Sequence, residues 1–264
     1  MKAAGLSRTF ATVLLVTLMA LLSGCATIGQ IRGGPGQKLD PWENWNRKVF
    51  NFNEKLDENV LRPVATVYNN LVPSLVRTGV NNFFGNFADA WSGVNNLLQG
   101  KLELAFRDAF RVGTNTLFGL GGLIDVATDL GMERQYEDLG QTLGRWGVGP
   151  GAYIVWPLLG PSTVRESIAL PFDRMATPAL VINDGGTQWG VTGLQIVNTR
   201  AGLLGASRLI DDIALDKYTF LRDAYLQRRR SLVLDGEEKE EDPDPAPPPP
   251  AAAASAPVKV TPAK

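Results

Sequence analysis

Apolar residues recur at spacings of three and four along much of the chain, which is the pattern of amphipathic helices. The clearest such segment begins at "DPWENWNRKVFNFNEKLD". There Asp40 as N-cap, Pro41 at the first helical position and Glu43 at the third form a helix-start signal. The apolar face of this helix consists of Trp42, Trp45, Val49, Phe52, Leu56 and Val60. Pro63 is expected to end or kink it.

Four further segments are predicted to be helical. Pro73 stands near the start of "PSLVRTGVNNFFGNF", and Thr163 with Glu166 starts a helix expected to stop near Pro171. The last segment, "DKYTFLRDAYLQRRR", begins at a cap residue, Asp216. In "NNLLQGKLELAFRDAFRVGTNTLFG", Lys101, Arg107, Asp108 and Arg111 lie largely away from an apolar stripe of Leu98, Leu102, Ala105, Phe106, Ala109 and Phe110. The best strand candidate is residues 152–159, "AYIVWPLL", without an evident partner, so the fold is predicted to be mostly α.

Glycine clusters and asparagine pairs interrupt these apolar segments. The glycines gather in "FGLGGLIDVATDLG" and "GQTLGRWGVGPGAY", and the pairs are Asn69-Asn70, Asn81-Asn82 and Asn95-Asn96. Turns and caps use both residue types. In a protein packed against lipid, small residues let helices approach closely and amides bond across helices. The six tryptophans suit either a core or an interfacial belt. The pattern leaves both interpretations open.

The two ends of the chain differ from its middle. Lys2 and Arg8 precede an apolar run at residues 11–22, too short for a membrane span and typical of a signal peptide. The run ends in "LLSGC", which resembles the lipobox of bacterial lipoproteins and makes Cys25 the expected lipidation site. An ordinary cleaved signal beside an unrelated cysteine is the alternative. Ala26, by resemblance to enterobacterial sorting rules, favours the outer membrane.

These features divide the chain into four parts. We expect a signal peptide at 1–24, the lipidated cysteine and a tether at 25–39, and one helical domain at 40–233. The remaining residues, 234–264, are acidic and then rich in proline and alanine. They are expected to form a disordered tail.

Catalytic signals are absent from the sequence. The chain has no histidine, and its single cysteine is the expected lipid site, so the commonest catalytic and metal-binding groups are missing. Gly147-x-Gly149-x-x-Ala152 matches a dinucleotide fingerprint only formally, because no strand precedes it and no helix follows. Carboxylates such as Asp125 and Asp138 suit caps better than acid–base pairs. The net charge of −1 suggests no nucleic-acid partner. We therefore expect neither an enzyme nor a cofactor or metal site.

Several motifs in one order resemble the MlaA (VacJ) family of outer-membrane lipoproteins. They begin with the D-P-x-E-x-x-N-R start at Asp40 and its F-N continuation, and they cover residues 40–230. The later motifs are "RPVATVYNNLVP", "NNFFGN", "NNLLQG", "NTLFGLGGLIDVA", "LGQTLGRWGVGPGAYIVWPLLGPSTVRE", "RAGLLGASRLID" and "DAYLQRRR".

The resemblance implies a single ring-like or disc-like helical domain embedded in the periplasmic leaflet of the Gram-negative outer membrane. It implies no enzymatic activity. Such proteins remove mislocalised phospholipids from the outer leaflet through an amphipathic channel, associate with trimeric porins, and pass lipid to the periplasmic carrier MlaC. By position, the family's gating hairpin corresponds to residues 130–140, with Gly131 and Gly140 as possible hinges.

The asparagine-rich start suggests a site for a lipid with a charged head and apolar tails. Neutral amides can meet head groups without holding a fixed charge near hydrocarbon. We hypothesise that Asn46, Arg47, Asn51 and Asn53 face polar lipid parts or brace neighbouring backbone, while Trp42, Val49 and Phe52 face acyl tails or the core. Ordinary packing with polar solvent positions is the alternative. At the level of function, a scaffold lipoprotein and a lipid hydrolase are the competing readings.

Overall fold

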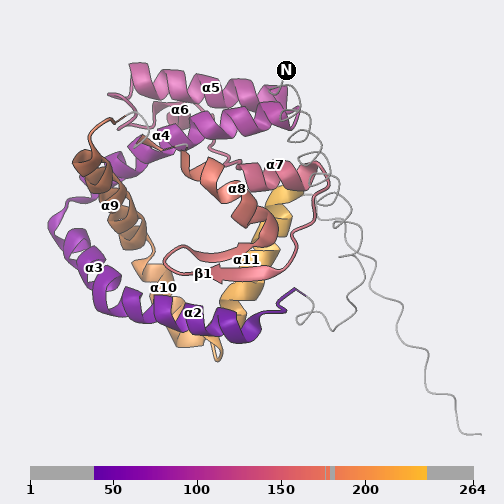
Figure 1. Cartoon of the computed structure of the whole chain (residues 1–264). Coiled ribbons are helices and arrows are strands. Elements are labelled where there is room, and N and C mark those ends of the chain that lie inside the picture. Colours follow the sequence, from indigo (N-terminus) through magenta and orange to yellow (C-terminus); the bar gives the residue numbers. More distant parts are fainter. Residues whose placement is uncertain (1–38, 176, 179–181, 237–264) are drawn as a thin grey trace, which may run out of the picture.

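The computed structural model describes residues 39–175, 177–178 and 182–236. Within them the chain is mostly helical, with one two-stranded sheet. The helices follow one another around a ring-like path (Figure 1). This confirms the predicted mostly α, ring-like domain. The predicted signal peptide, Cys25 and the tail beyond residue 236 lie outside the described residues.

The first arc of the ring is nearly continuous helix. It consists of α2 (Glu43–Leu56), a π-helical turn η2 (Asp57–Leu61) and α3 (Arg62–Leu71). Pro63 lies in the first turn of α3 and cannot donate to the carbonyl of Asn59, four residues earlier, which accounts for the wider turn there. The interruption predicted at Pro63 is therefore a change of helix type rather than an end.

The predicted cap at Asp40 is wrong. The residue before α2 is Trp42, which makes no side-chain cap hydrogen bond. The Asp40 carboxylate instead accepts hydrogen bonds from Asn46 Nδ2 at 2.8 Å and from the Tyr218 hydroxyl at 2.5 Å. Asp40 is thus buried and joins the beginning of the domain to its last helix.

The second arc is a helical hairpin of α4 (Ser74–Leu98) and α5 (Leu102–Leu117), which lie side by side (Figure 1). Pro73 is the residue before α4, as predicted, because its fixed φ suits a helix start. Gly100, with a φ of 78°, turns the chain between the two helices. The segment predicted as one helix from Asn95 onward is therefore divided between two.

Shorter elements follow α5 along the chain. These are α6 (Val126–Asp129), α7 (Leu139–Arg145), the strands β1 (Tyr153–Trp156) and β2 (Gly160–Thr163), and α8 (Val164–Met175). The strands pair antiparallel, with Tyr153 opposite Thr163 and Trp156 opposite Gly160. The partner missing from the sequence analysis is thus "GPST", whose residues carry little strand propensity.

The predicted start of α8 is confirmed, and its predicted end is wrong. Thr163 Oγ1 accepts a hydrogen bond from the Glu166 N–H at 3.4 Å. The helix then continues through Pro171 to Met175. The φ that a proline fixes is helical, so this residue removes one hydrogen bond without ending a helix held by turns on both sides.

The last arc consists of α9 (Gly185–Gly202), α10 (Leu204–Ile213) and α11 (Lys217–Val233). Asp216 accepts hydrogen bonds from the backbone of Tyr218 and Thr219, so the predicted cap of α11 is confirmed. The first and last arcs meet along a seam of ion pairs. These are Arg47–Asp216 at 2.7 Å, Arg62–Asp211 at 2.8 Å, Arg200–Asp57 at 2.6 Å, and Lys217–Glu54.

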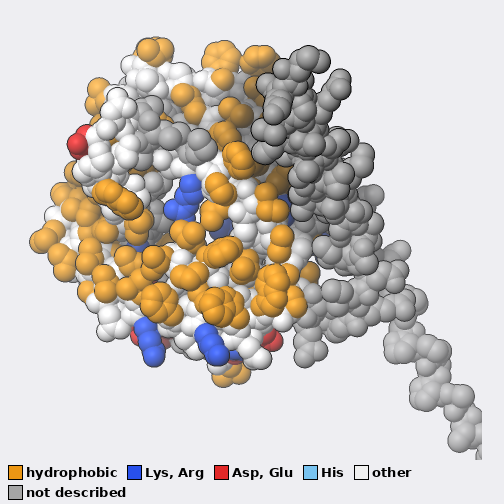
Figure 2. All heavy atoms as spheres, viewed as in Figure 1, with side chains coloured by type: hydrophobic (Ala, Val, Ile, Leu, Met, Phe, Trp, Pro, Cys, Tyr) orange, Lys and Arg blue, Asp and Glu red, His pale blue; other side chains and the backbone are white. Residues whose placement is uncertain are grey.

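Burial in this domain is the reverse of that in a water-soluble bundle. Among the described residues, buried polar and charged side chains outnumber buried apolar ones, while many large apolar side chains are exposed. Figure 2 shows apolar side chains over much of one face, most densely where Figure 1 places α3, α10 and the β hairpin. Apolar clusters are small, such as Val49, Tyr153, Val155 and Tyr218. None of the described helices is both long and apolar enough to cross a bilayer.

Candidate functional site

Helix α5 turns its charged face inward. Phe106 and Phe110 are 64% and 66% exposed, whereas Asp108 and Arg111 are almost fully buried. Most of the predicted stripe faces out of the domain, although Ala105 is buried and Leu98 belongs to α4. Burying a charge costs several kcal/mol unless it is paired, so the inward residues need partners.

Arg111 finds its partners in an ion network of Asp89, Arg111, Asp125 and Arg134. Together with Asp108, whose carboxylate is hydrogen-bonded by Asn96 and forms no ion pair within the described residues, this network is here called the polar wall. Arg111 donates to Asp89 at 3.2 Å and to both oxygens of Asp125 at 3.0 Å. Arg134 donates to Asp89 at 2.9 Å. Burial opposes ionisation of Asp125, but hydrogen bonds from Asn115 and Thr128, with the nearby arginines, lower its pKa overall.

Side-chain amides extend the polar wall between helices. Asn96 donates to Asp108 at 2.8 Å, and Asn95 accepts a hydrogen bond from Thr142 at 2.8 Å. Asn86 donates to Thr116 at 3.1 Å, linking α4 to α5. For these asparagines, bonding across elements is what the structure shows, which is the second of the two interpretations left open by the sequence.

The segment expected to be a gating hairpin has no strand or helix from residue 132 to 138. It is tied to α4, because Ser92 Oγ donates to the Gln135 carbonyl at 2.8 Å and accepts from the Glu137 N–H at 3.2 Å. Gly131, with a φ of 84°, has open space around it, as a hinge requires. Gly140 lies inside α7, where an added Cβ would meet the Glu166 carboxylate. Gating by this segment stays a prediction.

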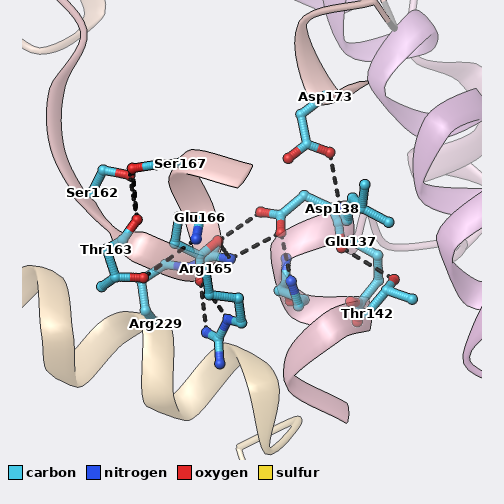
Figure 3. Close-up of polar contacts among 12 residues, drawn as sticks. Glu137, Asp138, Thr142, Ser162, Thr163, Arg165, Glu166, Ser167, Asp173 and Arg229 are labelled. Carbon is cyan, nitrogen blue, oxygen red and sulfur yellow. Dashed lines mark hydrogen bonds and ion pairs between the residues drawn. The ribbon is translucent and has the colours of Figure 1, made fainter. Parts of the chain in front are cut away.

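Beside Gly140, one ion cluster joins α7, α8 and α11 (Figure 3). Arg229 donates to both oxygens of Asp138, at 2.6 and 2.9 Å, and to Glu166 at 2.5 Å. Arg165 donates to Glu166 at 2.6 Å. Burial opposes ionisation of Asp138, yet the hydrogen bonds and charge of Arg229 lower its pKa. The Asp138 carboxylate also caps α7 by accepting from the Gln141 N–H at 2.8 Å.

A cavity of about 1150 Å³ opens next to this cluster. It lies between the start of α5, the segment before α7, α7 itself and the end of α11. Its charged lining residues are Lys101, Glu103, Arg134, Glu137, Asp138, Arg145, Arg228, Arg229 and Asp235. Apolar side chains, among them Leu102, Leu104 and Leu232, line the same space. The cavity is therefore amphipathic.

The asparagines of α2 clamp the β hairpin. Asn46 Nδ2 donates to the Tyr153 carbonyl at 3.1 Å, and its Oδ1 accepts from the Val155 N–H at 2.9 Å. Two helical turns later, Asn53 donates to the Trp156 carbonyl at 3.0 Å and accepts from the Leu158 N–H at 2.8 Å. Each amide thus supplies the donor and acceptor that a neighbouring strand would supply.

The other predicted residues of this motif lie on its outer sides. Arg47 donates to Glu43 and Asp216, and its guanidinium lies 4.4 Å from the ring centre of Tyr218. Pro41 and Asn51 are exposed, and no hydrogen bond or ion pair of Asn51 occurs within the described residues. Phe52 is 53% exposed, so it faces outward rather than into the core. The motif therefore divides between bracing the fold and facing the surroundings.

Sequence reasoning missed the polar wall and the Arg229 cluster. Asp108 and Arg111 stand three residues apart opposite an apolar stripe, which was visible, but an amphipathic pattern does not say which face is inside. The carboxylates that pair with Arg111 come from residues 14 and 22 positions away, and Asp89 is joined in turn to Arg134, 45 positions from it. Only the fold brings these groups together.

Fold and site together define a class: a ring of helices with apolar side chains outside and paired charges within, a surface suited to lipid rather than to water. The chain belongs to the MlaA lipoprotein family, whose model matches residues 38–232. The predicted family is thus confirmed.

Relatives and a solved structure agree with this assignment. "Intermembrane phospholipid transport system lipoprotein MlaA" of Escherichia coli K12 is 35% identical over 223 residues, which is 83% of this chain and 87% of that protein. The protein of the same name in Haemophilus influenzae is 34% identical, over 86% and 92% of the two chains. A solved structure described as "Structural basis for maintenance of bacterial outer membrane lipid asymmetry" superposes with a TM-score of 0.65 at 35% identity, covering 74% of this chain and 98% of that one.

Proposed function

We propose that this protein takes part in intermembrane phospholipid transport, removing mislocalised phospholipid from the outer leaflet of the outer membrane. The observation that carries the proposal is the reversed burial on α5, with Phe106 and Phe110 outside and Asp108 and Arg111 within. A ring built in this way can rest in hydrocarbon, while the charged lining of the amphipathic cavity between α5, α7 and α11 offers polar surface to a lipid head group. The names of the relatives support the same system.

The finer parts of the proposal concern position and partners. We propose that Cys25 carries the lipid anchor and that the ring lies within the periplasmic leaflet. A trimeric porin would hold it in the outer membrane, and the periplasmic carrier MlaC would receive the lipid. The protein would bind and release phospholipid without hydrolysing it, since moving an intact lipid breaks no covalent bond.

A transfer assay tests this proposal against its competitors. The purified full chain is incubated with vesicles containing labelled phospholipid and with acceptor vesicles or the soluble carrier. We expect intact labelled phospholipid to move to the acceptor. A scaffold lipoprotein would move none, and a lipid hydrolase would release lysolipid or fatty acid; either result contradicts the proposal. In cells, loss of the protein should raise the phospholipid exposed at the surface, and the wild-type chain should restore it.

A further inference from the structure

The cavity between α5, α7 and α11 carries charges of both signs on one lining. Most are already paired: Lys101 contacts Glu137 at 3.1 Å, and Arg145 contacts Asp235 at 3.1 Å. Arg228 and Glu103 differ. Both line the cavity, both are exposed, and neither has a hydrogen bond or ion pair within the described chain. The cavity thus offers one cation and one carboxylate to a ligand.

Buried polar atoms on the same lining also lack partners. Gln141 Oε1 and Arg229 Nε make no hydrogen bond, although the Gln141 side chain is almost fully buried. A buried donor or acceptor without a partner costs about 1–3 kcal/mol. Both atoms are shielded from solvent by the residues around them, so they add to the polarity of the wall but do not themselves contact a ligand.

Exposed apolar side chains also line the cavity. Leu102 and Tyr136 are 57% and 51% exposed, and both belong to the lining. An apolar extension of a bound polar group could lie along them. The lining therefore suits an amphipathic molecule that has a charged group at one end and an apolar chain at the other.

We propose that this cavity binds the zwitterionic head group of a phospholipid, with its phosphate at Arg228 and its ammonium at Glu103. The proposal rests on the proposed transport function and adds a head-group preference to it. A simple anion fits less well, because it would pair with Arg228 and leave the Glu103 carboxylate on the same lining without a counter-charge. A zwitterionic head group pairs with Arg228 and Glu103 at once, and the first carbons of the acyl chains would then lie along Leu102.

Binding of two soluble short-chain lipids to the full chain in detergent tests the site. The probes are dihexanoyl phosphatidylethanolamine, which is zwitterionic, and dihexanoyl phosphatidylglycerol, which is anionic. We expect the first to bind about tenfold more tightly, as one charge-assisted contact provides. Arg228→Gln should weaken both lipids about tenfold. Glu103→Gln should weaken only the ethanolamine lipid, because only that lipid carries an ammonium.

The control variant is Arg208→Gln on α10, an exposed arginine away from the cavity, which should change neither affinity. Arg228 and Glu103 have no partners to lose, so their variants should melt at the wild-type temperature. Equal binding of the two lipids, or unchanged binding in both variants, would overturn the site. Inorganic phosphate that competes as well as the ethanolamine lipid would show a plain anion site instead.

The same measurements separate this site from the transport proposal. A wild-type chain that moves phospholipid between vesicles, while both variants bind lipid as it does, overturns the cavity alone. A wild-type chain that moves none, while Arg228→Gln still loses affinity, overturns transport alone.

Discussion

At the scale of single residues, the asparagines of α2 act as substitutes for backbone. Asn46 and Asn53 stand seven positions apart, which places both on one helix face. Asn46 bonds Tyr153 and Val155 within β1, and Asn53 bonds Trp156 at the end of β1 and Leu158 two residues later. The two amides cover the edge of a strand that has only one neighbouring strand. This explains why a helix carries a residue type with poor helix propensity.

The residue-scale prediction compares three asparagines of this helix. Asn46→Ala removes three buried hydrogen bonds, those to the Asp40 carboxylate, the Tyr153 carbonyl and the Val155 N–H, and should lower the free energy of unfolding by about 3 kcal/mol. Asn53→Ala, at a half-buried position, should cost about 1 kcal/mol. Asn51→Ala is the control, because Asn51 is exposed and unbonded within the described chain, and it should change stability by less than about 0.5 kcal/mol. Urea unfolding in detergent measures all three; equal effects would contradict the bracing role.

The sequence indicated much of this motif but not its target. Asparagines on a helix beside aromatic residues pointed to an unusual environment, and bracing of backbone was one of two expectations. The strand that they brace was predicted at residues 152–159, yet its pairing with "GPST" was not, because glycine and proline there read as a turn. Local patterns identified several helices but not α9 or α10, and contacts distant in sequence left no local trace.

At the scale of elements, small residues decide how closely α7 approaches its neighbours. A Cβ on Gly140 would stand 1.7 Å from Glu166 Oε2 and 2.9 Å from Arg229 Nη2. A Cβ on Gly113, also within a helix, would meet nothing within 4 Å. A side chain is therefore excluded at Gly140 and tolerated at Gly113, although the sequence alone does not distinguish the two glycines.

Replacing each of these two glycines with alanine should change the free energy of unfolding in opposite directions. Gly140→Ala should destabilise the protein by about 3 kcal/mol, because the buried Glu166–Arg229 pair must separate. Gly113→Ala should stabilise it by about 0.5–1 kcal/mol, because alanine favours a helix more than glycine does. Thermal unfolding of both variants in the same detergent measures the difference. A Gly140→Ala protein as stable as the wild type would show that α7 does not pack this closely.

The ion cluster around Asp138 should also make stability depend on pH. The pKa of the Asp138 carboxyl is lowered from its ordinary value of 3.8 in the folded protein, so the unfolded chain binds a proton at this carboxyl more readily. The stabilisation is present above about pH 4 and is lost as the pH falls through the folded pKa. Asp138→Asn should lower stability at neutral pH and flatten the acid side of the curve. The free energy of unfolding of both proteins is measured from about pH 3 to 6. The same slope against pH in the wild type and in Asp138→Asn would contradict this role of Asp138.

At the scale of the whole molecule, the exposed apolar surface is too extensive for a protein surrounded by water. Leu75 and Leu117 are 82% and 78% exposed, and many other large apolar side chains are exposed like them. Soluble monomers rarely show large continuous apolar surface. The surface should therefore hold the domain at a membrane independently of an acyl chain.

Removing the expected anchor tests this. A Cys25→Ser chain should remain in the membrane fraction after a high-salt wash, because apolar burial is not screened by salt. Adding Leu75→Glu and Leu117→Glu should shift a large part of it to the soluble fraction or to aggregates. Arg208→Glu, at an exposed polar position, is the matched control and should leave it in the membrane fraction. Complete release of the Cys25→Ser chain would contradict membrane contact by the ring.

The seam between the first and last arcs has a consequence for how such a domain can change. Arg47–Asp216, Arg62–Asp211 and Arg200–Asp57 fasten it with side chains alone. The ring is therefore closed by contacts between side chains and not by a continuous run of backbone. A substitution at this seam would therefore weaken the hold of one arc on the other while the helices within each arc kept their own backbone hydrogen bonds.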